Sequence, residues 1–201
     1  MGGGAAWTHL HGLPGAAPVP AAQAKAKAAP APVLELTAIE TRPPAGQTCA
    51  AVQFQAAAAR VAEVPARDGH WAPSRAAGLC DLRYRVVNRG GEELSVWAFA
   101  ARRDGDAANV RTRAFARERH LPPGGALVID GRPPRDLAGA LDQGLVVAAA
   151  ARPGEALRRD LNDHADGFGQ PISPRAWDTF RRNLDGVRGL AVVAADHEIR
   201  P

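Results

Sequence analysis

Hydrophobic and polar residues alternate most clearly from Leu82 to Val86, where three apolar residues are separated by two arginines. A period of two is typical of a strand with one buried face. Residues 88–91 then supply asparagine and glycine, which suit a turn. Nearly every residue from Leu94 to Ala100 is apolar, and a strand that is apolar on both faces lies centrally in its sheet. The pattern predicts two strands folded back on each other, the second of them central.

Short strands are expected at further places along the chain. In order, they are 33–40, 49–55, 109–117, 126–130, 145–151 and 190–194, of which 126–130 and 145–151 are expected to be buried. Residues 56–64 fit either a helix or a continuation of the preceding strand. Proline and glycine mark the connections, as in 43–46 and 121–125. Short strands at such spacing predict a mainly β fold, an antiparallel immunoglobulin-like β-sandwich.

Two helices are expected in the last third of the chain, at about 155–162 and 173–184. The second has a good N-cap in Ser173, a proline at its first position in Pro174, and Gly186 after its last turn. As a helical insertion before the last strand, the pair would cover one face of a sheet. The apolar face of the second helix consists of Trp177, Phe180 and Leu184.

Composition separates a tail from a domain. Residues 1–32 are rich in alanine, proline and glycine, which predicts a disordered N-terminal tether, and the folded domain is expected at 33–201. The net charge of +4 permits an acidic partner without requiring one. No apolar window is long enough for a transmembrane segment. The N-terminus lacks a signal peptide, so we expect a cytoplasmic protein unless an export signal is missing from this sequence.

The two cysteines, Cys49 and Cys80, allow more than one interpretation. They could form a disulfide, and they could equally be two buried thiols of a cytoplasmic protein. Cys80 is in phase with the buried positions of 82–86, where a thiol is usually inert. Pairing of Cys80 with His70 as a catalytic dyad would instead make the chain a small hydrolase.

The densest polar cluster runs from Asp160 to Gly167 and offers a second basis for a hydrolase, or a calcium site. Framed as an EF-hand loop from Asn162, it has Ser173 where the bidentate glutamate belongs. The six histidines show no zinc spacing, and the serines have no nucleophile-elbow context. A phosphate-cradling glycine loop is missing as well. We therefore expect no catalytic residue, no metal and no cofactor.

Arginines are concentrated around the predicted central strands. If the strands share a sheet face, the side chains form one basic surface that could bind nucleic acid, anionic lipid or an acidic protein. The modest net charge favours instead a solvated outer face. The residues that would form the basic surface are Arg83, Arg85, Arg111 and Arg113.

The order of these elements resembles a known family. A strand at 82–87, an Asn-x-Gly turn, a strand at 94–99, the Leu-Pro-Pro-Gly-Gly loop at 121–125 and a strand at 144–151 are together similar to an uncharacterised β-sandwich domain. That domain is often attached to bacterial caspase-like peptidases. The resemblance covers about residues 80–153 and implies an accessory role without a catalytic residue. The expected function is a non-catalytic protein-binding or assembly module of a bacterial complex, with a hydrolase and an arginine-mediated nucleic-acid binder as alternatives. Another protein is the expected partner, and the oligomeric state stays open.

Overall fold

The structure of the chain is a computed structural model that describes residues 33–49, 60–65, 79–105, 107–131 and 139–199. The expected tether at 1–32, most of the expected strand at 49–55 and His70 lie outside the described residues. Where residues 56–64 fitted either a helix or a strand, the described part, from Arg60 onward, is a strand.

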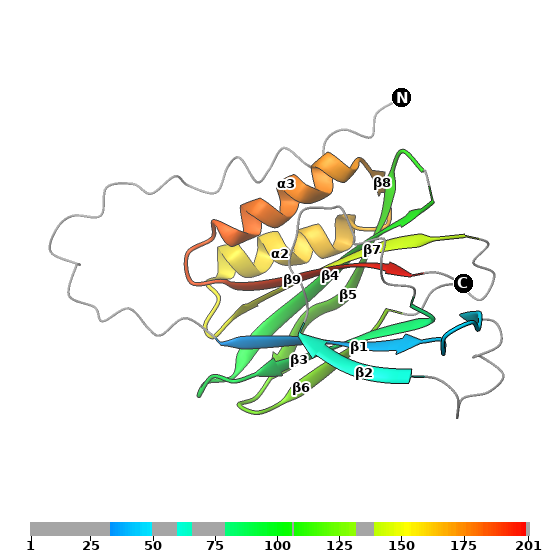
Figure 1. Cartoon of the computed structure of the whole chain (residues 1–201). Coiled ribbons are helices and arrows are strands. Elements are labelled where there is room, and N and C mark those ends of the chain that lie inside the picture. Colours follow the sequence, from blue (N-terminus) through cyan, green and yellow to red (C-terminus); the bar gives the residue numbers. More distant parts are fainter. Residues whose placement is uncertain (1–32, 50–59, 66–78, 106, 132–138, 200–201) are drawn as a thin grey trace, which may run out of the picture. The chain divides into compact units, whose positions relative to one another are not determined.

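Two antiparallel sheets make up most of the described chain (Figure 1). The four-stranded sheet contains, from edge to edge, β2 (Arg60–Pro65), β1 (Leu34–Arg42), β3 (Asp81–Asn88) and β6 (Ala126–Asp130). The five-stranded sheet contains β8 (Pro171–Ile172), β5 (Val110–Leu121), β4 (Leu94–Asp104), β7 (Leu141–Ala150) and β9 (Ala191–Ile199). The prediction of a mainly β, antiparallel fold is confirmed. The apolar strand β4 is the central one of its sheet.

The expected hairpin of β3 and β4 is wrong, because the two strands belong to different sheets. The connection after Asn88 crosses from one sheet to the other. The fully buried side chain of Asn88 donates to the carbonyl oxygens of Glu92 and Leu121, at 2.7 and 2.9 Å, and accepts from the Gly90 amide. These bonds satisfy the carbonyl groups of Glu92 and Leu121 at the point where the chain crosses between the sheets. A turn sequence predicts that the chain reverses. A reversal within one sheet and a crossing to the other sheet have the same turn residues, so the sequence does not distinguish them.

The side chains that the two sheets turn toward each other form one hydrophobic core. From the four-stranded sheet come Leu36, Leu82 and Val86, all at alternate strand positions. The five-stranded sheet contributes the even-numbered side chains of β4, among them Val96 and Ala98. The core therefore lies between the sheets, and each strand that crosses it presents alternate residues to it.

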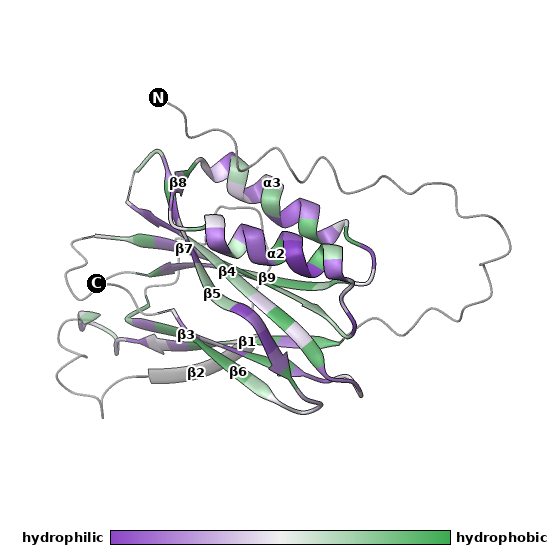
Figure 2. Cartoon of the chain, turned by 180° about the vertical axis from the view of Figure 1, so that it is seen from behind, coloured by the Kyte–Doolittle hydropathy of each residue, from purple (hydrophilic) through white to green (hydrophobic). Residues whose placement is uncertain are grey.

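The opposite face of the five-stranded sheet packs against α2 (Glu155–Gly167) and α3 (Pro174–Asp185). Both helices alternate between hydrophilic and hydrophobic residues (Figure 2). The Ser173 hydroxyl caps α3 by accepting from the Ala176 amide at 3.2 Å. Trp97 of β4 donates to Asn162 of α2 at 2.9 Å. Along the chain, α2, β8 and α3 all lie between β7 and β9, which pair with each other. The rings of this layer are Trp97, Phe99, Phe168, Trp177 and Phe180.

Several elements are longer than the sequence pattern predicts. Strand β9 continues five residues past Ala194 to Ile199, and β7 begins four residues before Leu145. Helix α2 extends beyond 162 to Gly167. Strand β6 was expected to be buried, but it is an edge strand with alternate exposed residues. In β7 and β9 the additional residues are largely polar, so an apolar pattern cannot mark them.

Candidate functional site: a polar row between the sheets

One cross-strand row of the five-stranded sheet is polar where its neighbours are apolar. In register, Arg111 of β5 lies opposite Arg102 of β4, Arg102 opposite Gln143 of β7, and Gln143 opposite His197 of β9. Directly opposed residues of antiparallel strands share a face. We call Arg111, Arg102, Gln143 and His197 the polar row. It faces the four-stranded sheet, because Gln143 and His197 both contact Tyr84 of β3.

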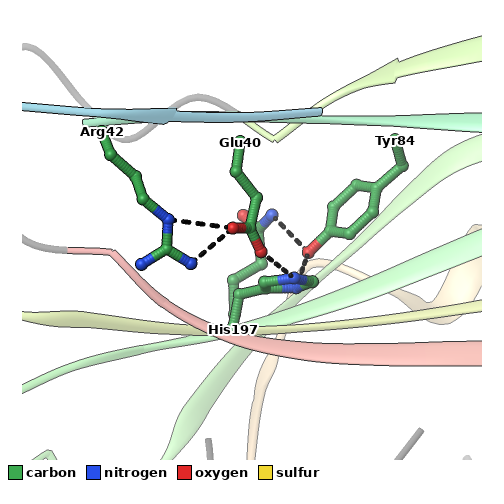
Figure 3. Close-up of polar contacts among 5 residues, drawn as sticks. Glu40, Arg42, Tyr84 and His197 are labelled. Atoms are coloured by element: carbon green, nitrogen blue, oxygen red, sulfur yellow. Dashed lines mark hydrogen bonds and ion pairs between the residues drawn. The ribbon is translucent and has the colours of Figure 1, made fainter. Parts of the chain in front are cut away.

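Hydrogen bonds connect the row to the four-stranded sheet. The Arg102 Nε donates to Gln143 Oε1 at 2.7 Å, and Gln143 Nε2 donates to the Tyr84 hydroxyl at 3.3 Å. The Tyr84 oxygen lies 3.1 Å from His197 Nδ1. His197 Nε2 lies 3.3 Å from Glu40 Oε1 of β1 (Figure 3). Five side chains from five strands thus form one continuous polar chain.

The donors and acceptors of this chain fit in one direction. Arg102 Nε carries a hydrogen and can only donate, which fixes the Gln143 amide with its NH₂ toward Tyr84. The Tyr84 hydroxyl accepts that bond, so its own hydrogen is available for His197 Nδ1. A neutral His197 then has its proton on Nε2, on the side of the Glu40 carboxylate. Arg42 completes the chain by donating from Nε to Glu40 Oε2 at 3.1 Å.

Burial decides what the chain can do chemically. Tyr84 and Gln143 are fully buried, and Glu40 and His197 are nearly so. Burial is the largest cause that raises the pKa of the Tyr84 phenol, and the hydrogen bond from Gln143 lowers it only in part. Tyr84 therefore keeps its proton near neutral pH. The buried chain positions side chains, and its exposed end at β5 is where it can meet a ligand.

Gly131, which directly follows β6, makes room for this chain. A Cβ at this position would lie 2.6 Å from Gln143 Nε2 and 2.7 Å from the Leu82 carbonyl oxygen. Both distances are too short for any side chain, and the second contact is to backbone, which cannot turn away. The glycine is required by close approach at this position.

Three arginines gather at the exposed end of the row. Arg102 and Arg111 are directly opposed, and Arg113 is opposite Ala100, two residues along on the same face of β5. Arg111 and Arg113 are exposed, whereas Arg102 is half-buried. The pKa of Arg102 lies below its usual value because burial penalises its charge and because Arg113 is close. Asp130 and Asp104 act in the opposite direction.

The four arginines that could have formed one basic surface lie in two sheets. Arg111 and Arg113 belong to the five-stranded sheet, and Arg83 and Arg85 belong to β3 of the other sheet. The condition for one basic surface, that the strands share a sheet face, is not met, because β3 and β5 lie in different sheets. Arg83 and Arg85 alternate with core residues of β3, so they point away from the core.

The outer surface of the four-stranded sheet mixes charge with apolar side chains. Arg83 is opposite Ile39 of β1 on one side and Asp130 of β6 on the other. In the next row Arg85 is opposite Val128, which is 58% exposed. Among the described residues no helix covers this surface, and we call it the open face; it consists of Ile39, Arg83, Arg85, Val128 and Asp130, of which Ile39 and Arg85 are half-buried.

The two cysteines are joined by a disulfide, with their Cα atoms 5.0 Å apart. Both are buried. The Cys80 amide donates to the Thr41 carbonyl at 2.7 Å. The disulfide therefore lies next to the end of β1. A sulfur in a disulfide is not a thiolate, and in this form Cys80 lacks the group that the hydrolase interpretation needs. His70, the other member of that dyad, lies outside the described residues.

The acidic cluster at 160–167 lies on α2 rather than in a loop. Asp166 forms an ion pair with Arg117 of β5 at 2.6 Å. Within the described ranges, no group of three or more histidine, cysteine, aspartate and glutamate side chains could hold a metal ion. In those same ranges no helix is long and apolar enough to cross a membrane.

The sequence pattern did not identify Gln143, His197, Glu40 or Tyr84 as a group. Gln143 and His197 lie in the extensions of β7 and β9, where the apolar pattern stops. Glu40 ends a predicted strand, and Tyr84 reads as an ordinary core residue. A usable signal is Asp196-His197-Glu198, three polar residues directly after an apolar strand and before Ile199.

Comparisons of the chain with models of protein families, with curated proteins and with solved structures found no match. The similarity of residues 80–153 to the domain of bacterial caspase-like peptidases therefore stays a prediction. The polar row and the open face are interpreted from their own geometry.

Proposed function

We propose that the chain is a non-catalytic protein-binding or assembly module, built on an immunoglobulin-like β-sandwich with a C-terminal helical insertion. The shared core between two antiparallel sheets supports the sandwich. The position of α2 and α3 between the paired strands β7 and β9 supports the insertion. If the resemblance of residues 80–153 is genuine, the module serves a bacterial complex as an accessory domain.

The observation that carries the proposal is the difference between the outer surfaces of the two sheets. The five-stranded sheet is covered by helices that bury its aromatic side chains. The open face presents Val128 beside Arg85, and Ile39 beside Arg83. Arginine is among the residues that protein interfaces favour, and Val128 adds exposed apolar surface beside it. We therefore assign the protein partner to the open face.

The charges of the open face favour a protein over a nucleic acid. Arg83 has Asp81 at 3.6 Å and Asp130 directly across the strand pair. A nucleic-acid backbone would meet these carboxylates together with the arginines, and binding would gain little from counterion release. A protein surface with both signs of charge and an apolar patch can match the same pattern.

The test compares two variants in affinity capture from the native host, read by quantitative mass spectrometry. Arg83→Gln combined with Val128→Ser alters the open face, and both side chains are exposed enough to leave the core intact. Arg175→Gln removes one exposed arginine from α3 and serves as control. We expect specific partners of the wild type to be depleted about tenfold with the first variant and kept with the second. Equal capture by both variants would refute the open face as the docking surface.

The disulfide bears on the compartment in which the module works. Disulfides persist in oxidising compartments and are rare in the cytoplasm. The Cys49–Cys80 bond therefore supports export over a cytoplasmic location. Peptide mapping of the native protein under non-reducing conditions, with free thiols alkylated beforehand, tests this. Recovery of both cysteines as alkylated thiols would mean that the disulfide is not formed, and it would favour a cytoplasmic location.

A further inference from the structure

The arginines at the end of the polar row are an unfavourable combination for neighbouring strands, because like charges lie opposite each other. Arg102 and Arg111 are directly opposed on neighbouring antiparallel strands, and Arg113 shares their face one diagonal step away. Opposed side chains of this kind have Cβ atoms about 5 Å apart, where like charges destabilise the sheet. Local rules of this kind are broken mainly where a functional site requires it.

Arg102 is also held in place, which an incidental surface arginine is not. Its Nε bond to Gln143 uses one of five guanidinium hydrogens, and Gln143 is fully buried and bonded in turn to Tyr84. The remaining four hydrogens, on the two terminal nitrogens, form no hydrogen bond to another described residue. A guanidinium oriented by buried partners is arranged in advance for a ligand.

Arg111 and Arg113 are equally available. Among the described residues, Arg111 forms no ion pair, and the contact of Arg113 is with the ring of Phe115, 5.1 Å from guanidinium carbon to ring centre. The carboxylates of Asp130 and Asp104 act on Arg102 but form no ion pair with the three arginines. Three guanidinium groups on one face exceed the two negative charges nearby.

We propose that Arg102, Arg111 and Arg113 form a binding site for a phosphate-type oxyanion. Three forks of donors from separate backbone positions suit a tetrahedral anion with three or four oxygens, whereas one fork suffices for a carboxylate. The anion relieves the repulsion that the charge of Arg113 exerts on Arg102. Free phosphate and the phosphate group of a monoester share this chemistry. The three arginines belong to the five-stranded sheet and not to the open face, although Asp130 of that face acts on Arg102. The site does not depend on the protein-binding proposal.

The test is isothermal titration calorimetry of the full chain at low ionic strength, with inorganic phosphate and with phenyl phosphate as probes. We expect saturable binding that weakens about tenfold or more in Arg111→Gln and in Arg113→Gln. Arg119→Gln is the matched control, because Arg119 is an exposed arginine of the same strand. Its affinity should stay within about twofold of the wild type.

The outcomes separate the sources of the anion and the failure of the proposal. Binding of both probes supports a phosphate carried on a larger molecule, and binding of inorganic phosphate alone supports a free anion. Arg102→Lys, which keeps the charge and loses the fork, should weaken binding as well. Absence of saturable binding, or equal weakening in Arg119→Gln, would overturn the site. Thermal melts of each variant confirm that the exposed substitutions leave the fold intact.

Discussion

The two faces of the five-stranded sheet are both buried, but one is packed with aromatic rings and the other includes a hydrogen-bonded polar row. The face under α2 and α3 is a layer of rings, in which Phe99, Phe168 and Phe180 have centres 5.0 to 5.3 Å apart. The face toward the other sheet is apolar along most of its length but is interrupted by the polar row, where Gln143 and His197 are buried with partners.

The difference teaches that equal burial does not mean equal tolerance. The aromatic layer is held mainly by buried apolar area, which is not directional, and ring packing adds a smaller, geometry-dependent contribution. The polar chain from Arg102 to Glu40 depends on each donor meeting its acceptor, since an unmatched buried group costs more than its bond contributes. Loss of volume should therefore be the severe change on one face, and loss of direction on the other.

The largest effect is expected in the aromatic layer. Trp177→Ala removes a fully buried ring that lies 5.8 Å from Phe180 and 6.4 Å from Phe168, measured between ring centres. We expect the free energy of unfolding to fall by about 3–5 kcal/mol. Arg175→Ala, an exposed position of the same helix, should change it by less than about 0.5 kcal/mol. Denaturant titration measures both, and a near-neutral Trp177→Ala would mean that the helix does not depend on this ring.

A smaller but still steric effect is expected at the polar row. Gly131→Ala places a methyl group against Gln143 and the Leu82 carbonyl. The expected loss of unfolding free energy is about 1–3 kcal/mol, as for other overpacked sites. Gly91→Ala is the control, because a Cβ there meets nothing within 4 Å. If the two variants melt alike, the close approach at Gly131 does not exist in solution.

The aromatic face could be predicted from the sequence, but the polar row could not. Trp177, Phe180 and Leu184 repeat at helical spacing, and the run from Leu94 to Ala100 is apolar on both faces. Such patterns record burial directly. The row is made of one residue from each of four strands, and its members meet only once the register is set. The sequence carries no periodic signal for a contact between Gln143 and Tyr84, 59 residues apart.

The same limit explains the misplaced arginines. A face shared by Arg83 and Arg111 was conceivable from the sequence because their strands are near neighbours along the chain. Sheet membership depends on whether the chain reverses within a sheet or crosses to the other. Here it crosses, and the Asn88 side chain bonds to the carbonyl groups of Glu92 and Leu121 at the crossing. A turn asparagine has the same appearance in either case.

A double-mutant cycle sharpens the contrast in direction. Tyr84→Phe removes one hydroxyl, and Gln143→Leu removes the amide that meets it. Each single change should cost about 1–2 kcal/mol, because it leaves a buried partner unmatched. The double variant should cost less than the sum, since both members of the bond are then gone. Additive losses in denaturant titration would mean that the two side chains do not interact.

The smallest effect concerns charge in the aromatic layer, where His164 of α2 has its ring centre 5.4 Å from that of Phe180. Burial lowers the pKa of His164 below 6.5, although Asp160 and Asp163 act in the opposite direction. The unfolded chain therefore takes up the proton first as the pH falls. The stability that depends on a neutral His164 is present above about pH 6.5 and is lost as the pH falls below it.

His164→Gln removes this titration and leaves the rest of the layer in place. The free energy of unfolding should fall less steeply between about pH 7.5 and 5.5 in the variant than in the wild type, because one source of proton uptake by the unfolded chain is gone. Chemical denaturation at several pH values measures the slope for each protein. The other histidines contribute equally to both slopes, so the difference reports His164 alone. A variant with the same slope, or a steeper one, would mean that His164 is not desolvated by the aromatic layer. The aromatic layer would then be open to water at His164, and at this position it would be less enclosed than the polar chain.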